Sequence, residues 1–306
     1  MNSNLKSNFM SPHINKIKLT KEELIYQVCI SLFVLLVVFV CVVPFMYVVG
    51  MSLTSEGEMI ERNYFVIIPS RPILSAYRYI ITQTNFFNGM KITILRTILG
   101  VIAALILTVP VGYILAKEDL PFKKGVMLFF IATMIFNGGL IPNFLLMKDL
   151  GLLNSFWVYV VPGLANTYGI LVVKLFVEGI PDDIIESADL DGATETQKMT
   201  FIAIPLLKPT ILALGLFAAV THWNDWFTAM VYVKDPSIYP IQFIIRNLLT
   251  QNTSGELMSN VNTFSKMTTQ SIKMASVVVA ALPILCVYPF LQKYFIHGMY
   301  TGSVKG

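Results

Sequence analysis

The chain has 306 residues, of which 55% are apolar and 13% are charged, and its formal net charge is +4. Soluble domains are about a quarter charged, so this composition excludes an ordinary soluble protein and indicates a membrane protein. The small net charge is spread over several segments, which excludes a basic patch for nucleic acid, and we expect no nucleic-acid partner.

Apolar runs along the chain predict an all-α membrane protein with six transmembrane helices. A helix needs about 20 apolar residues to cross the hydrocarbon core of a bilayer. The first run is too long for a signal peptide and lacks its cleavage site, so we expect a retained anchor helix. Lys91 and Arg96 lie in the first turns of the second run, where they can snorkel to the interface. The six predicted spans are 24–51, 89–116, 122–147, 153–177, 202–232 and 275–296.

The distribution of lysines predicts how the spans are oriented. The N-terminal tail, residues 1–20, and the first position after it together hold four lysines, and the connection 117–124 holds three, whereas the connection 148–152 holds one. Cytoplasmic segments carry an excess of positive charge. We therefore expect both termini and the loop around 178–201 in the cytoplasm. The long loops 52–88 and 233–274 are then outside, and the second of them is apolar enough to form a partly helical cap on the spans.

Small and polar residues interrupt two of the predicted spans. Asn137 precedes the Gly138-Gly139 pair in the third span, and Asn166 and Tyr168 interrupt the fourth. Backbone groups freed by such breaks must be satisfied by a neighbour or by a water-filled cavity. Asn137 and Asn166 are therefore candidate residues of a permeation pathway, and tight helix packing at small residues is the alternative interpretation.

The segment 221–227, THWNDWF, lies deep in the fifth predicted span. Aromatic rings and an amide suit sugar recognition, which makes Trp223, Asn224 and Trp226 candidates for the substrate pathway, with an interfacial tryptophan girdle as the alternative. Residues three apart share a helix face, so we expect Trp223 and Trp226 on one face and Asn224 at its margin. Asp225 is expected to pair with a neighbouring helix, and a proton-coupling carboxylate is the alternative.

The segment 186–205 is an acidic, polar island between two apolar runs. Irregular polar backbone is not tolerated against lipid, so the island must lie outside the bilayer. Most of its residues favour helix, and Gly192 allows a break in the middle. We expect a compact helical pair that a partner protein grips, with its aspartates capping helix starts or facing water.

This island resembles the EAA loop of ABC importer permeases, whose pattern is E-A-A, three residues, G, nine residues and I-x-L-P. Ser187 stands where the pattern has Ala, and Ile204 stands where it has Leu; both are small changes. The triplet 191–193 is typical of the carbohydrate branch, and residues 117–151, 221–227 and the C-terminus resemble the MalG-like and LplC-like permeases for oligosaccharides. The matching positions are Glu186, Ser187, Ala188, Gly192, Ile202, Ile204 and Pro205.

The resemblance implies a type I ABC importer permease fold, with a permease domain over 21–306 and a cytoplasmic coupling helix in the loop 178–205. It implies a multi-pass protein of the bacterial cell membrane, surrounded by lipid, that is not itself an enzyme. The implied partners are a second homologous permease, two ATPase subunits that bind ATP and Mg, and an extracellular sugar-binding protein. The residues implied to couple to the ATPase are Glu186, Ser187, Ala188, Asp191, Gly192 and Ala193.

Other features of the sequence agree with a transport role without covalent chemistry. A G-x-x-x-x-G-K-[ST] loop is absent, so the chain is not expected to bind nucleotide by itself. Three scattered cysteines and three scattered histidines lack metal-ligand spacing, so neither a metal nor another cofactor is expected. The expected function is ATP-driven import of oligosaccharides. The alternative is a secondary transporter driven by an ion gradient, which needs a carboxylate at mid-membrane, and Asp225 is the candidate for it.

Overall fold

The computed structural model of the chain describes residues 20–251 and 268–303, with side chains to Cys286 in the second range. Every element in these ranges is a helix, which confirms the predicted all-α class. The chain divides into two compact units, residues 1–47 and 48–306. The predicted N-terminal tail lies almost wholly outside the described residues.

The first unit contains most of α1 (Lys21–Ser52), a continuous helix of 32 residues. At 1.5 Å per residue it is about 48 Å long, which is more than the hydrocarbon core requires. Its apolar side chains, such as Leu35 and Phe39, are exposed all round the helix. A helix of this length that is apolar on every face has the length and composition of a membrane span.

The second unit has two more continuous helices of spanning length. These are α4 (Phe86–Ala116) and the 269–286 part of α15 (Thr269–Ser303). Three bent pairs of helices are also long and apolar enough to cross a membrane if each pair is taken together. They are α5 (Lys123–Ile135) with α6 (Leu140–Asp149), residues 156–163 with α7 (Thr167–Val177), and residues 195–206 with α11 (Lys208–Asn224). The described residues therefore contain three continuous spans, or six if each bent pair is one span.

Three of the predicted spans are not single straight helices. The smallest bend, 41°, lies between residues 156–163 and α7 in the predicted span 153–177. The chain bends by 114° between α5 and α6, where Gly139 adopts a left-handed φ of +86°, so the break lies at the predicted Gly-Gly pair. The prediction that residues 202–232 form one helix is wrong. The structure bends by 78° before Lys208, ends α11 at Asn224, and then starts the short α12 (Phe227–Tyr232). The apolar pattern continues through these bends, and hydropathy alone does not reveal them.

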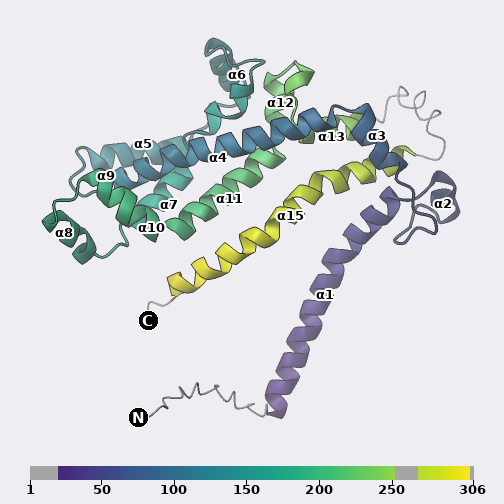
Figure 1. Cartoon of the computed structure of the whole chain (residues 1–306), viewed down its shortest axis with the longest axis horizontal. Helices are drawn as coiled ribbons and strands as arrows, with labels where there is room; N and C mark the ends of the chain where they lie inside the picture. The colour runs from purple at the N-terminus through teal and green to yellow at the C-terminus, as the bar shows by residue number, and fades with distance from the viewer. Residues whose placement is uncertain (1–19, 252–267, 304–306) are drawn as a thin grey trace, which may run out of the picture. The chain divides into compact units, whose positions relative to one another are not determined.

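Helix α4 lies at the centre of the second unit and packs against α7 and α11 (Figure 1). Two glycines allow this close approach. A Cβ atom on Gly112 would lie 2.6 Å from the Cβ of Val173, and one on Gly100 would lie 2.3 Å from Nε2 of His222. Small residues at such contacts are the usual means of packing membrane helices closely. The core at the Ala116 end of α4 contains Val109, Tyr113, Val173, Ala203 and Leu207.

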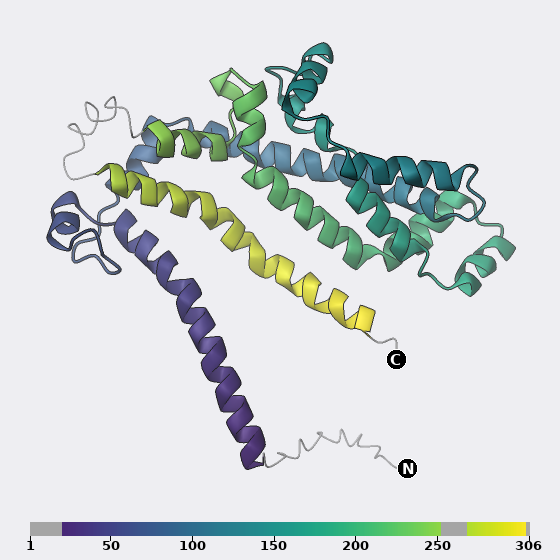
Figure 2. The same cartoon turned by 180° about the vertical axis from the view of Figure 1, so that it is seen from behind.

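At the Phe86 end of α4 lie α3 (Ser75–Gln83) and α13 (Ile241–Gln251) (Figure 1; Figure 2). At the Ala116 end lie α8 (Asp182–Leu190) and α9 (Glu195–Gln197). Helix α13 packs on α4 and α15 and buries Ile241, Ile245 and Leu248. The predicted partly helical cap is therefore present over 241–251. Residues 252–267 of that predicted loop lie outside the described residues.

Candidate functional site: the EAA-like loop

The EAA-like loop folds as a helix, a tight turn and a second helix. Helix α8 begins after Pro181 and carries two aspartates in its first turn, where they interact well with the helix dipole. It ends where Gly192 adopts a φ of +75°, and the Ala193 N–H donates to the carbonyl of Ala188 at 2.9 Å. This left-handed glycine with a bond back to the last turn is a Schellman cap. The predicted helical pair with its break at Gly192 is confirmed.

A capping box starts the second helix of the loop. The hydroxyl of Thr194 accepts a bond from the Gln197 N–H at 3.4 Å, and the Gln197 side chain accepts one from the Thr194 N–H at 2.8 Å. Two N–H groups that the helix cannot satisfy are thereby paired. The chain continues into a π-helical turn, Lys198–Ala203. Local chemistry therefore holds the two halves of the loop in a defined geometry.

An open hollow of about 380 Å³ lies between the two halves of the EAA-like loop, at the turn around Gly192. Four of the six residues implied to couple to the ATPase line it. Glu186 and Ser187 lie instead on the exposed part of α8, where the Ser187 hydroxyl donates to the Ile184 carbonyl at 3.0 Å. The sequence did not point to Gln197 or Phe201 as lining residues. The hollow is lined by Ala188, Asp191, Gly192, Ala193, Gln197, Phe201 and Ile202.

Exposed apolar side chains accompany the hollow. Leu190 is 90% exposed at the end of α8, and Phe201, which lines the hollow, is 76% exposed. A Cβ atom on Gly192 would meet no atom of the chain within 4 Å. Apolar side chains gathered on an otherwise polar surface are typical of a site for a protein partner. The loop therefore combines a shallow hollow with the apolar contacts that such a partner needs.

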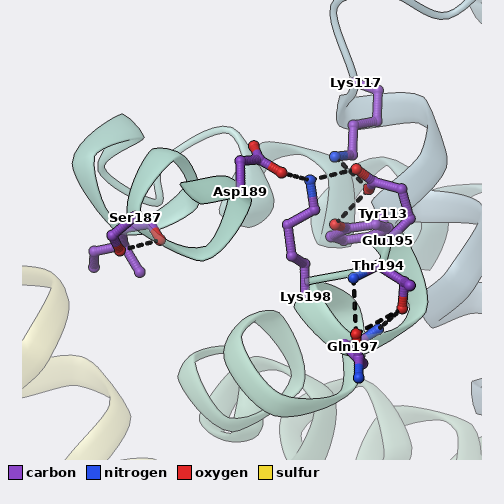
Figure 3. A network of polar contacts seen from close by, with 9 residues as sticks. Tyr113, Lys117, Ser187, Asp189, Thr194, Glu195, Gln197 and Lys198 are labelled. Atoms are coloured by element: carbon purple, nitrogen blue, oxygen red, sulfur yellow. Dashed lines mark hydrogen bonds and ion pairs between the residues drawn. The ribbon is translucent and has the colours of Figure 1, made fainter. Parts of the chain in front are cut away.

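A network of charges connects the loop to the end of α4 (Figure 3). The Lys198 ammonium lies 2.5 Å from Asp189 Oδ1 and 2.5 Å from Glu195 Oε1. The other oxygen of Glu195 accepts a bond from the Tyr113 hydroxyl at 3.0 Å and pairs with Lys117. Asp189 was expected to cap a helix or face water; its side chain is 53% exposed, as expected, and it also pairs with the buried Lys198.

A second ionic contact lies just before the loop. The Lys174 ammonium donates to Glu178 at 2.6 Å, and Lys123 lies 3.5 Å from the other carboxylate oxygen. The hydrogen bond from Lys174 outweighs burial and holds the pKa of Glu178 below its usual value. The carboxylate therefore stays charged at neutral pH and links the start of α5 to the end of α7.

The tryptophans of the THWNDWF segment do not share a face, so that prediction is wrong. Trp223 lies on α11, and its indole N–H donates to the Ala280 carbonyl of α15 at 3.5 Å. Trp226 follows the helix end and packs beneath the Arg246 guanidinium, 3.4 Å from the ring centroid. The helix ends between them, so their spacing of three no longer places them together. Asn224 is exposed at the last position of α11.

Asp225 pairs with Arg96 of α4, which confirms the expected contact with a neighbouring helix. Arg96 also donates to the Asp225 carbonyl at 2.9 Å and lies 4.3 Å above the ring of Tyr159. Arg96 is 1% exposed, so it does not snorkel as its position near the helix start suggested. The Asp225 side chain accepts a bond from the Thr228 N–H at 3.1 Å and starts α12. This pair lies at the break after Asn224, where Asp225 has extended backbone conformation.

The two asparagines at the span breaks satisfy backbone groups locally. Asn137 accepts a bond from the Gly139 N–H at 2.9 Å, and Asn166 caps α7 by accepting one from the Gly169 N–H at 3.0 Å. Both are exposed in this chain. Their part in a permeation pathway, like that of Trp223, Asn224 and Trp226, stays a prediction.

Comparison with known proteins places the chain among transport permeases. Residues 93–300 match the family described as binding-protein-dependent transport system inner membrane component. Protein LplC from Bacillus subtilis (strain 168) is 37% identical over 291 residues, which cover 94% of this chain and 97% of LplC. The polygalacturonan/rhamnogalacturonan transport system permease protein YtcP of the same organism is 36% identical over 92% of this chain and 99% of YtcP.

Solved structures agree with the sequence relatives. A chain in the crystal structure of a bacterial ABC transporter involved in the import of the acidic polysaccharide alginate superposes with a TM-score of 0.82 at 27% identity, covering 90% of this chain and 99% of that chain. A chain of the alginate transporter in complex with an alginate pentasaccharide-bound periplasmic protein has a TM-score of 0.52 at 15% identity, which shows the fold alone, over 88% of this chain and 92% of that chain. The type I importer permease fold is confirmed. The chain is a multi-pass membrane protein that belongs to the family of binding-protein-dependent transport system inner membrane components.

Proposed function

We propose that this chain is the membrane-spanning permease of an ATP-driven, binding-protein-dependent importer of oligosaccharides. The observation that carries the proposal is the EAA-like loop. One hollow, beside the exposed ring of Phe201, is lined by four of the residues that the resemblance assigns to ATPase coupling: Ala188, Asp191, Gly192 and Ala193. A preformed hollow with exposed apolar contacts suits a protein partner. In a transport permease, that partner is the ATPase that supplies the energy.

The importer then contains several chains. Two separate ATPase subunits bind ATP and Mg and contact the EAA-like loop from the cytoplasm, and a second homologous permease completes the translocation pathway. A sugar-binding protein delivers substrate on the other side, as supported by the periplasmic protein in the alginate transporter complex. ATP drives transport because it binds one conformation of the complex better than the other and so shifts the equilibrium between them.

The substrate class is supported by the relatives. YtcP is named for polygalacturonan and rhamnogalacturonan, and the alginate transporter imports an acidic polysaccharide. Alginate and polygalacturonan are both polymers of sugar acids. Oligomers of uronic acids are therefore the first substrates to test, with neutral oligosaccharides of the same length as the comparison.

Reconstitution tests this proposal. The tagged full-length chain is purified from its native membrane, and co-purified proteins are identified by mass spectrometry. We expect an ATPase and a second permease in stoichiometric amounts. Vesicles containing this complex should accumulate labelled oligosaccharide only with both ATP and the binding protein. The proposal is wrong if no ATPase co-purifies, or if uptake proceeds without ATP.

The alternative, a transporter driven by an ion gradient, makes the opposite prediction. It requires uptake to stop when a protonophore or sodium ionophore collapses the gradient and to continue without ATP. Its candidate carboxylate, Asp225, is bound by Arg96, which disfavours a role in carrying a proton. The same vesicles separate the two mechanisms.

A further inference from the structure

A row of alternating charges runs from α8 to the end of α4, and the EAA pattern includes none of its members. We call this row the charge relay; it consists of Asp189, Lys198, Glu195 and Lys117, with the Tyr113 hydroxyl beside Glu195 (Figure 3). The acids belong to the two helices of the EAA-like loop, and Tyr113 and Lys117 belong to the last turn and cap of α4. The relay therefore bonds the loop to the central helix of the second unit.

Lys198 is the centre of the relay. Its side chain is 5% exposed, while those of Asp189 and Glu195 are each more than half exposed. A buried ammonium needs its partners, because an unpaired charge in that position is costly. The capping box of Thr194 and Gln197 fixes the helix start that presents Glu195, and the π-helical turn begins at Lys198 itself. Local structure therefore holds the charged groups in place before any partner binds.

Helix α4 is suited to carry a displacement onward. From Arg96 to Ala116 it is helical throughout, with Pro110 inside it, which is about 30 Å at 1.5 Å per residue. Arg96 binds Asp225 at the break after α11, and the Thr93 hydroxyl accepts a bond from the Ile241 N–H at the start of α13, at 2.8 Å. The same continuous helix is thus bonded to the loop at one end and to the elements around 225–241 toward the other.

We propose that Glu195 and Lys198 are positioning residues that transmit movement of α8 to α4, so that the EAA-like loop and α4 move as one body. The inference rests on the proposed function. Apolar packing in the cluster of Val109, Tyr113 and Ala203 can slide, whereas paired charges at fixed distances resist sliding. Coupling between distant sites is carried by such polar networks joined to rigid helices.

The test compares Lys198→Met and Glu195→Gln with matched controls in the complete importer. Lys124→Met and Glu118→Gln change the same residue types at exposed positions near this end of the molecule. Three quantities are measured: the amount of ATPase bound, ATP hydrolysis with loaded binding protein, and sugar taken up per ATP hydrolysed. We expect the relay variants to retain bound ATPase but to take up about fivefold less sugar per ATP, or less still. The controls should match the unaltered complex.

The double variant adds a further criterion. If Glu195 and Lys198 act in one relay, combining their substitutions should lower uptake per ATP no further than the worse single variant, because contacting residues are not additive. Unchanged uptake per ATP in both single variants overturns the proposal. It is also overturned if uptake falls only in proportion to lost ATPase, since the relay then merely keeps the loop folded, or if the control variants show the same loss.

A distance measurement tests the relay without any partner chain. Spin labels at positions 114, exposed on α4, and 183, exposed on α8, report the distance between the two helices. We expect a narrow distribution in the unaltered chain and a broad one in Lys198→Met. Equal widths overturn the relay. Failure of the proposed function appears differently, as an unaltered chain that purifies without ATPase, and the distance measurement still decides whether the relay is rigid.

Discussion

Substitution of Gly192 tests whether the hollow of the EAA-like loop is an interface. Its φ of +75° means that any other residue there is strained, at a cost of about 1–2 kcal/mol in the left-handed region. No atom of the chain lies within 4 Å of a Cβ built on Gly192, so Gly192→Asp produces no clash inside the molecule. We therefore expect the free energy of unfolding to fall by about 1 kcal/mol only, because Asp tolerates this conformation better than most residues.

The effect on ATPase binding should be larger. The new carboxylate lies beside Asp191 on the wall of the hollow, where like charge and lost space both oppose a partner. A cost of about 3 kcal/mol corresponds to binding roughly 100-fold weaker. The assay is titration of purified ATPase onto the permease in nanodiscs, with thermal unfolding of the permease measured in parallel. Gly192→Asn, which also tolerates a left-handed φ, separates the effect of size from that of charge.

Gly151 offers a matched control for this prediction. Its φ is +67°, and a Cβ there also meets no atom within 4 Å, but it follows α6 and not α8. Gly151→Asp should lower the unfolding temperature by a similar amount and leave ATPase binding unchanged. Binding by Gly192→Asp within about threefold of the unaltered chain would refute the assignment. Equal loss in both variants would show that strain, and not contact, is responsible.

Three further predictions follow from the described contacts. Arg96→Met leaves the Asp225 carboxylate unpaired and should lower the free energy of unfolding by about 3–5 kcal/mol. The double variant Arg96→Met with Asp225→Leu should recover part of this loss in thermal melts in detergent, and equal melting temperatures of the two variants contradict a buried pair. Trp226→Ala removes packing within the cluster around Ile92 and should reduce the amount of assembled complex. Trp223→Ala should instead lower sugar uptake per assembled complex, and unchanged uptake per assembled complex removes Trp223 from the pathway. Single cysteines at 124 and 183, in a chain without its native cysteines, should react with an impermeant maleimide only from the cytoplasm, and one at 235 only from outside; labelling of 183 and 235 from the same side contradicts the orientation.

Local features of the sequence determined the class of protein and the shape of its loop. A run of 32 mostly apolar residues forms α1 whatever surrounds it, because a helix satisfies its backbone groups within itself. The turn at Gly192 and the break at Gly138-Gly139 also follow from the chain itself, since glycine adopts a left-handed φ without the steric cost of a Cβ atom. The spacing of the EAA-like residues along one short segment therefore sufficed to identify the loop.

Contacts between distant residues decided the rest. Arg96 and Asp225 are 129 positions apart, and Tyr113 and Glu195 are 82 apart, so no periodicity or spacing pairs them. The apolar pattern runs on past Asn224, but Asp225, which pairs with Arg96, has extended backbone conformation where α11 ends and Trp223 is separated from Trp226. Lys198 is the buried centre of the relay because the fold brings Asp189 of α8 and Glu195 of α9 to its ammonium group. Side-chain pairing across the fold depends on how helices pack, and packing is a property of the tertiary structure that local sequence does not encode.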